Sequence, residues 1–331
     1  MRRASGSIFG LAYGDALGAP TEFLNMRQIH KRYGHDGPRD LPENPLVTDD
    51  TQMALAVAGG MLNALDNPPF TPDLITPIWR RRFLDWLHDP ENNRAPGQTC
   101  LRSCRGMDSG LPWVEATQHG SKGCGANMRV TPVGLVPGFT DETRSGAAQL
   151  QAALTHGHPT GLAASDLTAF ATWWLREGMA PADLPAALRD RCHVQRSTYH
   201  ERWLGDLWKH SEAPSPAEFI ARGWDECRQA LDRLDEALRR GDRESDPCEL
   251  TGAGWVAEEA LATALLCFLL FPEDPVSAIW RGAASSGDSD SIACLAGAFA
   301  GAHLGMDAWP REWQARIEYA DQLTRTGEAW D

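Results

Sequence analysis

Two acidic clusters in the sequence have residue types and a spacing that suit metal chemistry. Thr48-Asp49-Asp50-Thr51 precedes the apolar run 53–65, and Gly287-Asp288-Ser289-Asp290-Ser291 precedes the apolar run 292–304. A helix N-terminus favours one carboxylate, but acids this close repel one another unless some are protonated or a cation lies between them. Oxygen ligands without nearby Cys or His suit a hard cation such as Mg²⁺ or Mn²⁺. We interpret the clusters as facing halves of one metal site.

Helix capping is the competing interpretation of these clusters. Asp and Thr are ordinary N-cap residues, so either cluster taken alone is better explained as a capping turn. The two clusters share their composition, however, and each opens a small, apolar helix that must be buried. These two features together favour the paired site.

The elements that position the clusters are predicted to be helices. Alternating strand patterns are nearly absent, whereas Ala, Leu and Trp at helical spacing are common, so the fold class is all-α. The polar run 239–246 is too short to separate two domains, and we expect a single domain over residues 1–331 with a variable helical section around 195–250. Predicted helices cover residues 6–17, 70–87, 99–105, 138–154, 165–177, 181–192, a pair within 203–240, 253–271, 275–285, 292–304 and 312–324.

Glycines recur at four-residue intervals in two of the predicted helices. Gly6, Gly10, Gly14 and Gly18 mark the first helix, and 297, 301 and 305 are the corresponding glycines after the second acidic cluster. Each glycine inside a helix costs about 1 kcal/mol relative to alanine. Close approach of another helix backbone would offset this cost, so we expect these two helices at the centre of the bundle, packed on each other.

Composition limits the partners and the compartment. The chain has 31 basic and 45 acidic residues and a net charge of −14, which argues against general binding to nucleic acids or to anionic membranes. No apolar run reaches about 18 residues, so no membrane span is expected. The weak apolar segment near the N-terminus is interrupted by Gly14 and Asp15 and is not a convincing signal peptide. The eight cysteines form no C-x-x-C pair, and we predict a cytoplasmic protein with reduced thiols.

Several segments support the acidic clusters in a chemical site. The glycine-rich stretch 120–125 offers backbone N–H groups that suit a pyrophosphate, although an ordinary loop is the alternative. Arg129 behind it is predicted to fix the loop by pairing with a carboxylate. The segment 33–47 is a polar loop that we place over the site. Tryptophans inside helical runs are predicted to be core residues; they are Trp173, Trp174, Trp255 and Trp280.

Five segments of this chain, in this order, resemble motifs of the ADP-ribosylglycohydrolases. They are Gly14-Asp15-Ala16-Leu17-Gly18-Ala19-Pro20-Thr21-Glu22-Phe23, Thr48-Asp49-Asp50-Thr51, Gly123-Cys124-Gly125-Ala126-Asn127-Met128-Arg129, Thr155-His156-Gly157-His158-Pro159 and Gly287-Asp288-Ser289-Asp290-Ser291. The resemblance covers nearly the whole chain. It implies a compact orthogonal multi-helix bundle with two Mg²⁺ ions, or Mn²⁺ in their place, that hydrolyses the bond between C1″ of ADP-ribose and an acceptor.

The resemblance also implies roles for individual residues. The metal ligands would be Thr48, Asp49, Asp50, Asp288, Asp290 and Ser291. Glu22 would lie beside the metals, and we assign catalytic roles to Glu22 and Asp50. The substrate-binding residues would be Gly123, Cys124, Gly125, His156 and His158, although a purely structural turn is an alternative for the histidines. The family commonly has Thr at the position of Ser291, and Ser291 keeps the hydroxyl group that would bind the metal. The family usually has Asn at the position of Cys124, and this difference affects the expected preference for the acceptor.

Two other functions compete with hydrolysis. A class I terpene synthase also places two acidic motifs on facing helices, but the first motif here lacks a third acid and no Glu follows Asp288 in the next turn. An ADP-ribose-binding relative without turnover should have lost metal ligands, whereas all six positions retain oxygen side chains. The sequence does not identify the acceptor, which could be arginine, serine, a nucleobase or a small conjugate. We expect an ADP-ribosylated substrate and a monomeric protein.

Overall fold

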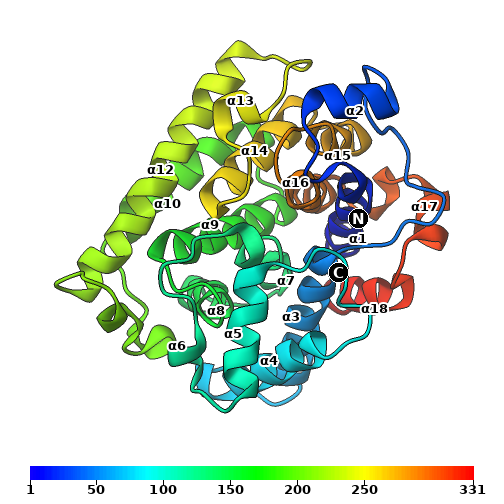
Figure 1. Ribbon diagram of the computed structural model, residues 1–331. Helices are drawn as coiled ribbons and strands as arrows, with labels where there is room; N and C mark the ends of the chain where they lie inside the picture. The colour runs from blue at the N-terminus through cyan, green and yellow to red at the C-terminus, as the bar shows by residue number, and fades with distance from the viewer.

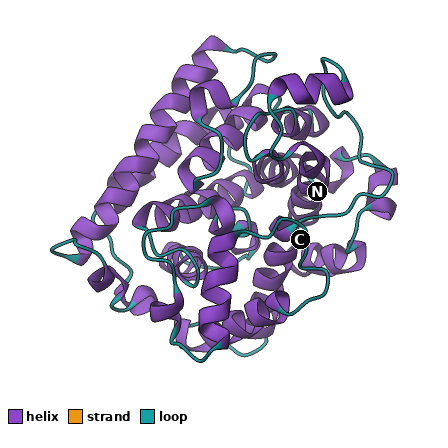
Figure 2. Ribbon diagram, in the orientation of Figure 1, coloured by secondary structure: helices purple, strands orange, loops and turns teal.

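The computed structural model describes residues 1–331 and consists of helices joined by loops (Figures 1 and 2). It contains eighteen α-helices and five short 3₁₀ helices. Two isolated bridges, between Gln118 and His156 and between Gly123 and Val256, are the only strand-like pairings. The prediction of an all-α fold is confirmed.

The α-helices are, in chain order, α1 (Arg3–Gly18), α2 (Met26–Tyr33), α3 (Asp49–Leu65), α4 (Pro72–Leu87), α5 (Gln98–Asp108), α6 (Trp113–Ala116), α7 (Thr131–Leu135), α8 (Asp141–Ala153), α9 (Pro159–Arg176), α10 (Leu184–Gln195), α11 (Glu201–Leu204), α12 (Pro216–Arg240), α13 (Cys248–Thr251), α14 (Ala257–Leu270), α15 (Pro275–Ala283), α16 (Ser289–Leu304), α17 (Arg311–Arg316) and α18 (Ala320–Trp330). The 3₁₀ helices are η1 (Ala19–Thr21), η2 (Cys124–Ala126), η3 (Pro181–Asp183), η4 (Leu207–His210) and η5 (Met306–Ala308).

Helices α1 and α16 lie side by side at the centre of the protein, with their backbones in direct contact (Figure 1). A Cβ atom on Gly10 would lie 2.2 Å from the carbonyl oxygen of Gly297, and one on Gly14 would lie 2.0 Å from that of Ala293. Any side chain at these positions would force the helices apart. The glycine spacing in the sequence therefore predicted this contact correctly.

The second acidic cluster is held at the start of α16 by a close backbone contact. The Asp288 N–H donates to the carbonyl oxygen of Ala253 at 2.7 Å. A Cβ atom on the preceding Gly287 would lie 1.9 Å from that same oxygen. Glycine is therefore required at 287, and the segment before α14 fixes the first turn of α16.

Several predicted elements differ from the structure. Helix α2 was not predicted; its start is stabilised by a capping box between Asn25 and Gln28. The predicted helical pair within 203–240 is instead the single turn α11, the 3₁₀ helix η4 and the 25-residue helix α12, which runs along one edge of the bundle (Figure 1). The predicted helix 312–324 is divided into α17 and α18, because Tyr319 adopts a left-handed backbone with φ of 57°.

One apolar cluster of 83 buried residues runs through the bundle. The two chain ends lie next to each other, since the backbone N–H groups of Ala4 and Ser5 donate to the side-chain carboxylate of the exposed Asp331 at 2.8 and 3.1 Å. None of the helices combines the length and the apolar character that crossing a membrane requires.

Candidate metal centre and the cavity around it

The first turns of α3 and α16 bring the two acidic clusters together. The Thr48 hydroxyl oxygen lies 3.2 Å from Asp50 Oδ2 and 3.4 Å from Asp290 Oδ2. Carboxylate oxygens of Glu22, Asp288 and Asp290 all lie within 4.8 Å of one another. Side chains that are far apart in the sequence thus form one group of closely spaced oxygens.

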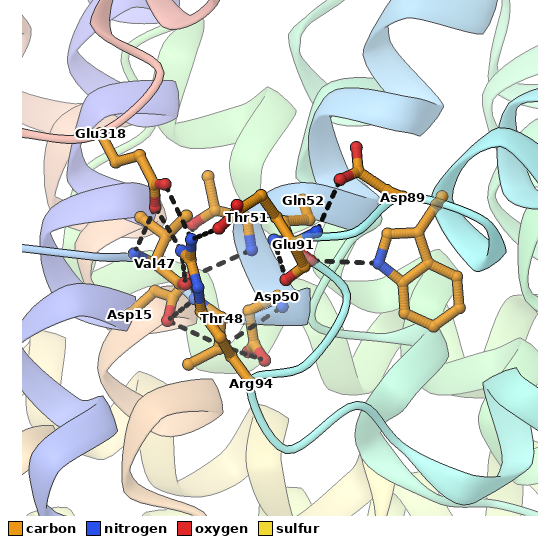
Figure 3. Close-up of polar contacts among 11 residues, drawn as sticks. Asp15, Val47, Thr48, Asp50, Thr51, Gln52, Asp89, Glu91, Arg94 and Glu318 are labelled. Carbon is orange, nitrogen blue, oxygen red and sulfur yellow. Dashed lines mark hydrogen bonds and ion pairs between the residues drawn. The ribbon is translucent and has the colours of Figure 1, made fainter.

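Asp15 is a further member of this group, to which the sequence analysis assigned no role. Its fully buried carboxylate accepts hydrogen bonds from the N–H and hydroxyl groups of Thr48, at 3.0 and 2.8 Å, and from those of Thr51, at 3.1 and 2.5 Å (Figure 3). Asp15 therefore fixes the start of α3 from the neighbouring helix α1. An aspartate inside a helix of glycine and apolar residues was the sequence signal for this role.

The end of the loop before α5 lies against the same cluster. The Gly97 N–H donates to Asp49 Oδ2 at 3.0 Å. Upstream, the Arg94 guanidinium donates to Glu318 Oε1 at 3.0 Å and to the Val47 carbonyl oxygen at 2.7 Å (Figure 3). Residues 94–97 are thereby held next to the acidic residues of α3, whereas the segment 33–47, predicted to cover the site, does not line the cavity.

The environment of the cluster disfavours negative charge. Burial, followed by the charge of Asp290, raises the pKa of Glu22 to about 9 and that of Asp15 to about 7. Burial raises the pKa of Asp49 to about 7 and the pKa of Asp50 well above its usual range. These acids must bind protons or cations to remain together.

The donor set fits divalent cations. Asp50 Oδ1 is buried and has no hydrogen-bond partner. The surrounding donors are carboxylate and hydroxyl oxygens, which are the ligands that Mg²⁺ and Mn²⁺ prefer. A cation would therefore satisfy Asp50 Oδ1 and reduce the repulsion among the carboxylates.

A cavity of about 460 Å³ opens onto the cluster. Its acidic and hydroxyl lining residues are Glu22, Asp49, Asp50, Asp288, Asp290 and Ser291. Thr48 does not line it and instead contacts Asp15 and Asp50 from behind. The structure thus places five of the six predicted metal ligands, together with Glu22, on one cavity surface.

The predicted substrate residues of the glycine-rich loop line this cavity. They are Gly123, Cys124 and Gly125. A Cβ atom on Gly125 would lie 2.9 Å from Cys100 Sγ, so the loop is closely packed. Burial raises the pKa of the Cys124 thiol well above its usual range, and the thiol therefore remains neutral.

Of the two predicted histidines, only His156 lines the cavity. Its Nδ1 lies 2.8 Å from the Thr155 hydroxyl oxygen, and burial, assisted by the charge of Arg129, lowers the pKa of His156 to about 3. His158 lies elsewhere: its Nδ1 accepts the Thr160 N–H at the start of α9, and it lines a separate cavity. His156 can contact a ligand as a neutral ring, whereas His158 serves as a helix cap.

Arg129 fixes the glycine-rich loop, but through a different partner from the one predicted. The buried guanidinium donates to the side-chain and backbone oxygens of Gln151 at 2.8 and 2.7 Å and to the Thr155 hydroxyl at 2.8 Å. It forms no ion pair with a carboxylate. The prediction of a bracing role agrees with this geometry, and the prediction of a carboxylate partner was wrong.

Trp255 was predicted to be a core residue, and this was wrong. Its side chain is 42% exposed, lines the cavity and stacks on Phe23, with ring centroids 5.5 Å apart and 17° between the planes. Gly252 and Gly254 have φ of 107° and 83° and form a turn before α14. Trp255 therefore belongs to this turn rather than to the helix that the sequence predicted from residue 253.

Comparisons with known proteins agree with this arrangement. A family model described as ADP-ribosylglycohydrolase matches residues 1–330. The chain is 34% identical over 164 residues to an uncharacterised protein of Archaeoglobus fulgidus, a match that spans 47% of this chain and 49% of that protein. It is 29% identical over 355 residues to the ADP-ribosylhydrolase ARH3 of Homo sapiens, spanning 96% of this chain and 90% of that protein. A solved chain titled ADP-ribosylglycohydrolase-related protein complex has the same fold, with a TM-score of 0.69, 24% identity and coverage of 99% and 96%. This chain therefore belongs to the ADP-ribosylglycohydrolase family of hydrolases.

Proposed function

We propose that the protein removes ADP-ribose from an acceptor by hydrolysing the glycosidic bond at C1″, with two Mg²⁺ ions in the acidic site. The observation that carries the proposal is the buried carboxylate group between α3 and α16, in which Asp50 Oδ1 has no partner. Family membership supports the hydrolytic reaction. Mn²⁺ could replace Mg²⁺ on the same oxygen ligands.

The ions would be held by the residues that the sequence predicted, Thr48, Asp49, Asp50, Asp288, Asp290 and Ser291. When bound, such ions stabilise developing negative charge, lower the pKa of a bound water and hold hydroxyl groups of the substrate in place. Asp15 positions the Thr48 side chain through its hydrogen bond to the hydroxyl group. The protein thereby fixes the geometry of the ligands before substrate binds.

Glu22 is the residue that we assign to proton transfer. It lines the cavity, and its carboxylate lies next to Asp288 and Asp290. Cleavage at C1″ builds positive character on the ribose and needs an activated water. Glu22 would accept the proton of that water as the bond to the acceptor breaks and would return a proton to the departing acceptor. Asp50 would contribute by holding a cation through Oδ1, which has no other partner.

The loop residues on the other side of the cavity would hold the rest of the substrate. The Gly123 and Cys124 N–H groups already donate to Ser121 Oγ at 3.4 Å and to the Trp255 carbonyl oxygen at 3.1 Å. The Gly125 N–H would therefore be the donor of this stretch to the diphosphate, and the neutral ring of His156 lies against the loop. The lining residues include no Lys or Arg. Binding of the diphosphate would therefore depend on backbone donors and on cations rather than on basic side chains.

Binding of ADP-ribose without turnover is the second candidate function. All predicted ligand positions carry oxygen side chains, which favours the enzyme. The terpene synthase alternative is excluded by the match of the whole chain to a different family. The eight cysteines form no disulfide, which supports our proposal of a cytoplasmic protein; the monomeric state stays a prediction.

Release of ADP-ribose from defined substrates tests the proposal. Purified protein is incubated with ADP-ribosyl-arginine, ADP-ribosyl-serine and ADP-ribosylated nucleobase, each with Mg²⁺ or with EDTA. We expect ADP-ribose release from at least one substrate, dependent on Mg²⁺. Binding of free ADP-ribose without release from any substrate would favour the non-catalytic alternative.

A further inference from the structure

Six consecutive residues, 95–100, line the acidic cavity between its two parts. Towards the first acidic cluster, the Gly97 N–H donates to Asp49 Oδ2 at 3.0 Å. Towards the glycine-rich loop, the Thr99 hydroxyl oxygen lies 3.0 Å from the Ser121 hydroxyl oxygen. We call residues 95–100 the cavity wall. Because it contacts both parts, its position determines the space that a ligand can occupy between the acidic cluster and the glycine-rich loop.

The cavity wall begins with a backbone conformation that its own sequence does not favour. Ala95 has φ of 53°, in the left-handed region that residues other than glycine avoid. Such a conformation persists only where the surrounding structure imposes it. The Ala95 side chain is exposed, so burial of its methyl group does not impose the conformation. The restraint must therefore come from neighbouring residues of the chain.

Arg94 supplies this restraint immediately before the cavity wall (Figure 3). Its guanidinium donates to the Val47 carbonyl oxygen at 2.7 Å and to Glu318 Oε1 at 3.0 Å, and it also pairs with Glu318 Oε2. Glu318 Oε2 in turn accepts the Val47 N–H at 3.0 Å. The Arg94 and Glu318 side chains are only 15% and 20% exposed. A two-pronged, charge-assisted pair of this kind is stronger and more directional than a single hydrogen bond.

The acidic cluster has a separate support that does not involve this pair. Val47 directly precedes Thr48, but Asp15 accepts hydrogen bonds from the N–H and hydroxyl groups of both Thr48 and Thr51. Neither Arg94 nor Glu318 lines the cavity. Loss of the pair should therefore release the cavity wall and leave the acidic cluster in place.

We propose that Arg94 and Glu318 are positioning residues for substrate binding: without touching the ligand, they hold the cavity wall in the shape that binds ADP-ribose. The inference rests on the proposed function for the identity of the ligand. It also assigns a role in the site to the C-terminal part of the chain, because Glu318 lies between α17 and α18 and is 224 residues from Arg94 in the sequence.

Calorimetric titration of Mg²⁺-saturated protein with ADP-ribose tests the proposal without turnover. Arg94→Ala removes the guanidinium, and ADP-ribose binding should weaken by roughly tenfold or more, because the cavity wall is no longer held in one position. The affinity for Mg²⁺, from titration of the metal into metal-free protein, should stay within about threefold, because Asp15 still fixes Thr48.

Hydrogen exchange of single amides reports the order of the cavity wall directly. In Arg94→Ala, the Gly97 amide should exchange roughly tenfold faster than in the wild type, because opening of the wall requires less free energy. The Thr51 amide, which donates to Asp15, should keep its rate. An unchanged exchange rate at Gly97 would overturn the inference, since the wall would then be held without Arg94.

Arg189→Ala is the matched control. Arg189 forms a partly buried ion pair with Asp235 between α10 and α12, and neither residue lines the acidic cavity. This variant should bind ADP-ribose within about twofold of the wild-type affinity, whereas on a cleaved substrate Arg94→Ala should raise KM roughly tenfold and change kcat less than about threefold. Equal losses of ADP-ribose affinity in the two variants would mean that Arg94 contributes only to stability.

Glu318→Gln provides the test if Arg94→Ala does not fold. Gln keeps an acceptor oxygen for Arg94, and Glu91 still accepts from Arg94 at 2.6 Å, so the variant should fold and weaken ADP-ribose binding by roughly threefold. Unchanged ADP-ribose affinity in this variant would overturn the positioning role.

Two further outcomes separate this inference from the proposed function. A loss of Mg²⁺ affinity as large as the loss of ADP-ribose affinity would show that Arg94 and Glu318 support the metal centre rather than the cavity wall, and would overturn the inference. A wild-type protein that binds ADP-ribose but cleaves no substrate would refute the proposed hydrolysis, whereas the comparison of ADP-ribose affinities would still decide the role of the pair.

Discussion

Buried carboxylates at the starts of α3 and α16 can be neutralised by protons or by cations. The Thr51 and Ser291 N–H groups, the Thr48 hydroxyl and the Gly97 N–H donate to some of the carboxylate oxygens, but Asp50 Oδ1 remains without a partner. Hydrogen bonds from neutral donors do not remove the repulsion among like charges at this spacing. We therefore expect substitutions of these residues to affect stability and activity differently with and without bound metal.

Glu22→Gln tests the proposed base. The substitution preserves the shape of the side chain and replaces the carboxylate that would accept a proton from water with a neutral amide. Turnover should fall by roughly 10²-fold or more, while affinity for ADP-ribose stays within a few-fold. Rates of ADP-ribose release and calorimetric titrations measure the two effects. Turnover near the wild-type value would remove Glu22 from the chemistry.

Asp15→Asn tests the support of the first cluster. The Asp15 carboxylate accepts four hydrogen bonds from the N–H and hydroxyl groups of Thr48 and Thr51. In the variant, the NH₂ group of the amide would face some of these N–H and O–H groups and could not accept their hydrogen bonds. We expect unfolding free energy in Mg²⁺ to fall by about 1–3 kcal/mol and metal affinity to weaken. Urea unfolding in Mg²⁺ measures the first effect. Asp66→Asn, at the exposed end of α3, is the control, and equal stability of the two variants would contradict the supporting role.

At the scale of elements, the contact of α1 with α16 sets the position of both clusters. Gly10→Ala places a methyl group 2.2 Å from the Gly297 carbonyl oxygen, which the backbones can relieve only by separating. We expect a loss of about 3 kcal/mol in unfolding free energy, and weaker Mg²⁺ binding because the first turns move.

Gly59→Ala is the matched control for this substitution. Gly59 also lies inside a helix, α3, but a Cβ atom there would meet only the flexible Arg82 side chain, at 3.5 Å. Alanine should stabilise the protein by roughly 0.5–1 kcal/mol through its helix propensity. Urea unfolding compares both variants with the wild type. Equal effects of the two substitutions would mean that the glycine spacing has no role in helix packing.

The sequence predicted the elements whose residues carry a strong period or a strong local signal. The glycine spacing of α1 and α16 and the acids at the starts of α3 and α16 fall in this group. Both signals are local, because helix periodicity and N-terminal capping depend on residues that are close together in the sequence. The meeting of the two clusters was predicted from their shared composition and from the buried helix that each one precedes, and the resemblance added the individual ligands.

What the sequence did not predict depends on contacts between distant segments. Asp15 acquires its role only because α3 starts beside α1, and His158 is separated from His156 by a loop turn that assigns it to the cap of α9. The exposure of Trp255 depends on the turn at Gly252 and Gly254. The sequence did not predict this turn, because the apolar residues that follow favoured a helix from residue 253. Helix propensity cannot determine such positions.

At the scale of the whole molecule, stability should depend on pH differently with and without metal. The folded-state pKa values of Asp15 and Asp49 are about 7 and that of Glu22 about 9, above the unfolded values of about 4. Protons therefore stabilise the metal-free fold below about pH 4, and this contribution is lost as the pH rises through 7 to 9. The pKa values of His156 and His158 are lowered to about 3 and about 4. These two histidines therefore decrease the stability of the fold as the pH falls below about 6.5.

Melting curves at several pH values isolate the contribution of the acidic site. The difference between the melting temperatures in Mg²⁺ and in EDTA should increase from pH 5.5 to pH 8, because protons compete with the cation at low pH. The contribution of the two histidines is common to both conditions and cancels in the difference. If the difference in melting temperature does not change with pH, the carboxylates whose pKa values are raised do not hold the metal.

Paired melting curves of the wild type and Asp290→Asn, with Mg²⁺ and with EDTA, test the central claim most directly. Asp290 lies in the first turn of α16, where its Oδ1 accepts the Ser291 N–H at 2.9 Å. Asn keeps this acceptor oxygen and removes a charge at the centre of the acidic cluster. We predict that the variant in EDTA is as stable as the wild type or more stable, because repulsion is relieved. It should also lose both the stabilisation by Mg²⁺ and the turnover. An unchanged response to Mg²⁺ together with full activity would contradict the metal centre and reduce the cluster to a helix cap.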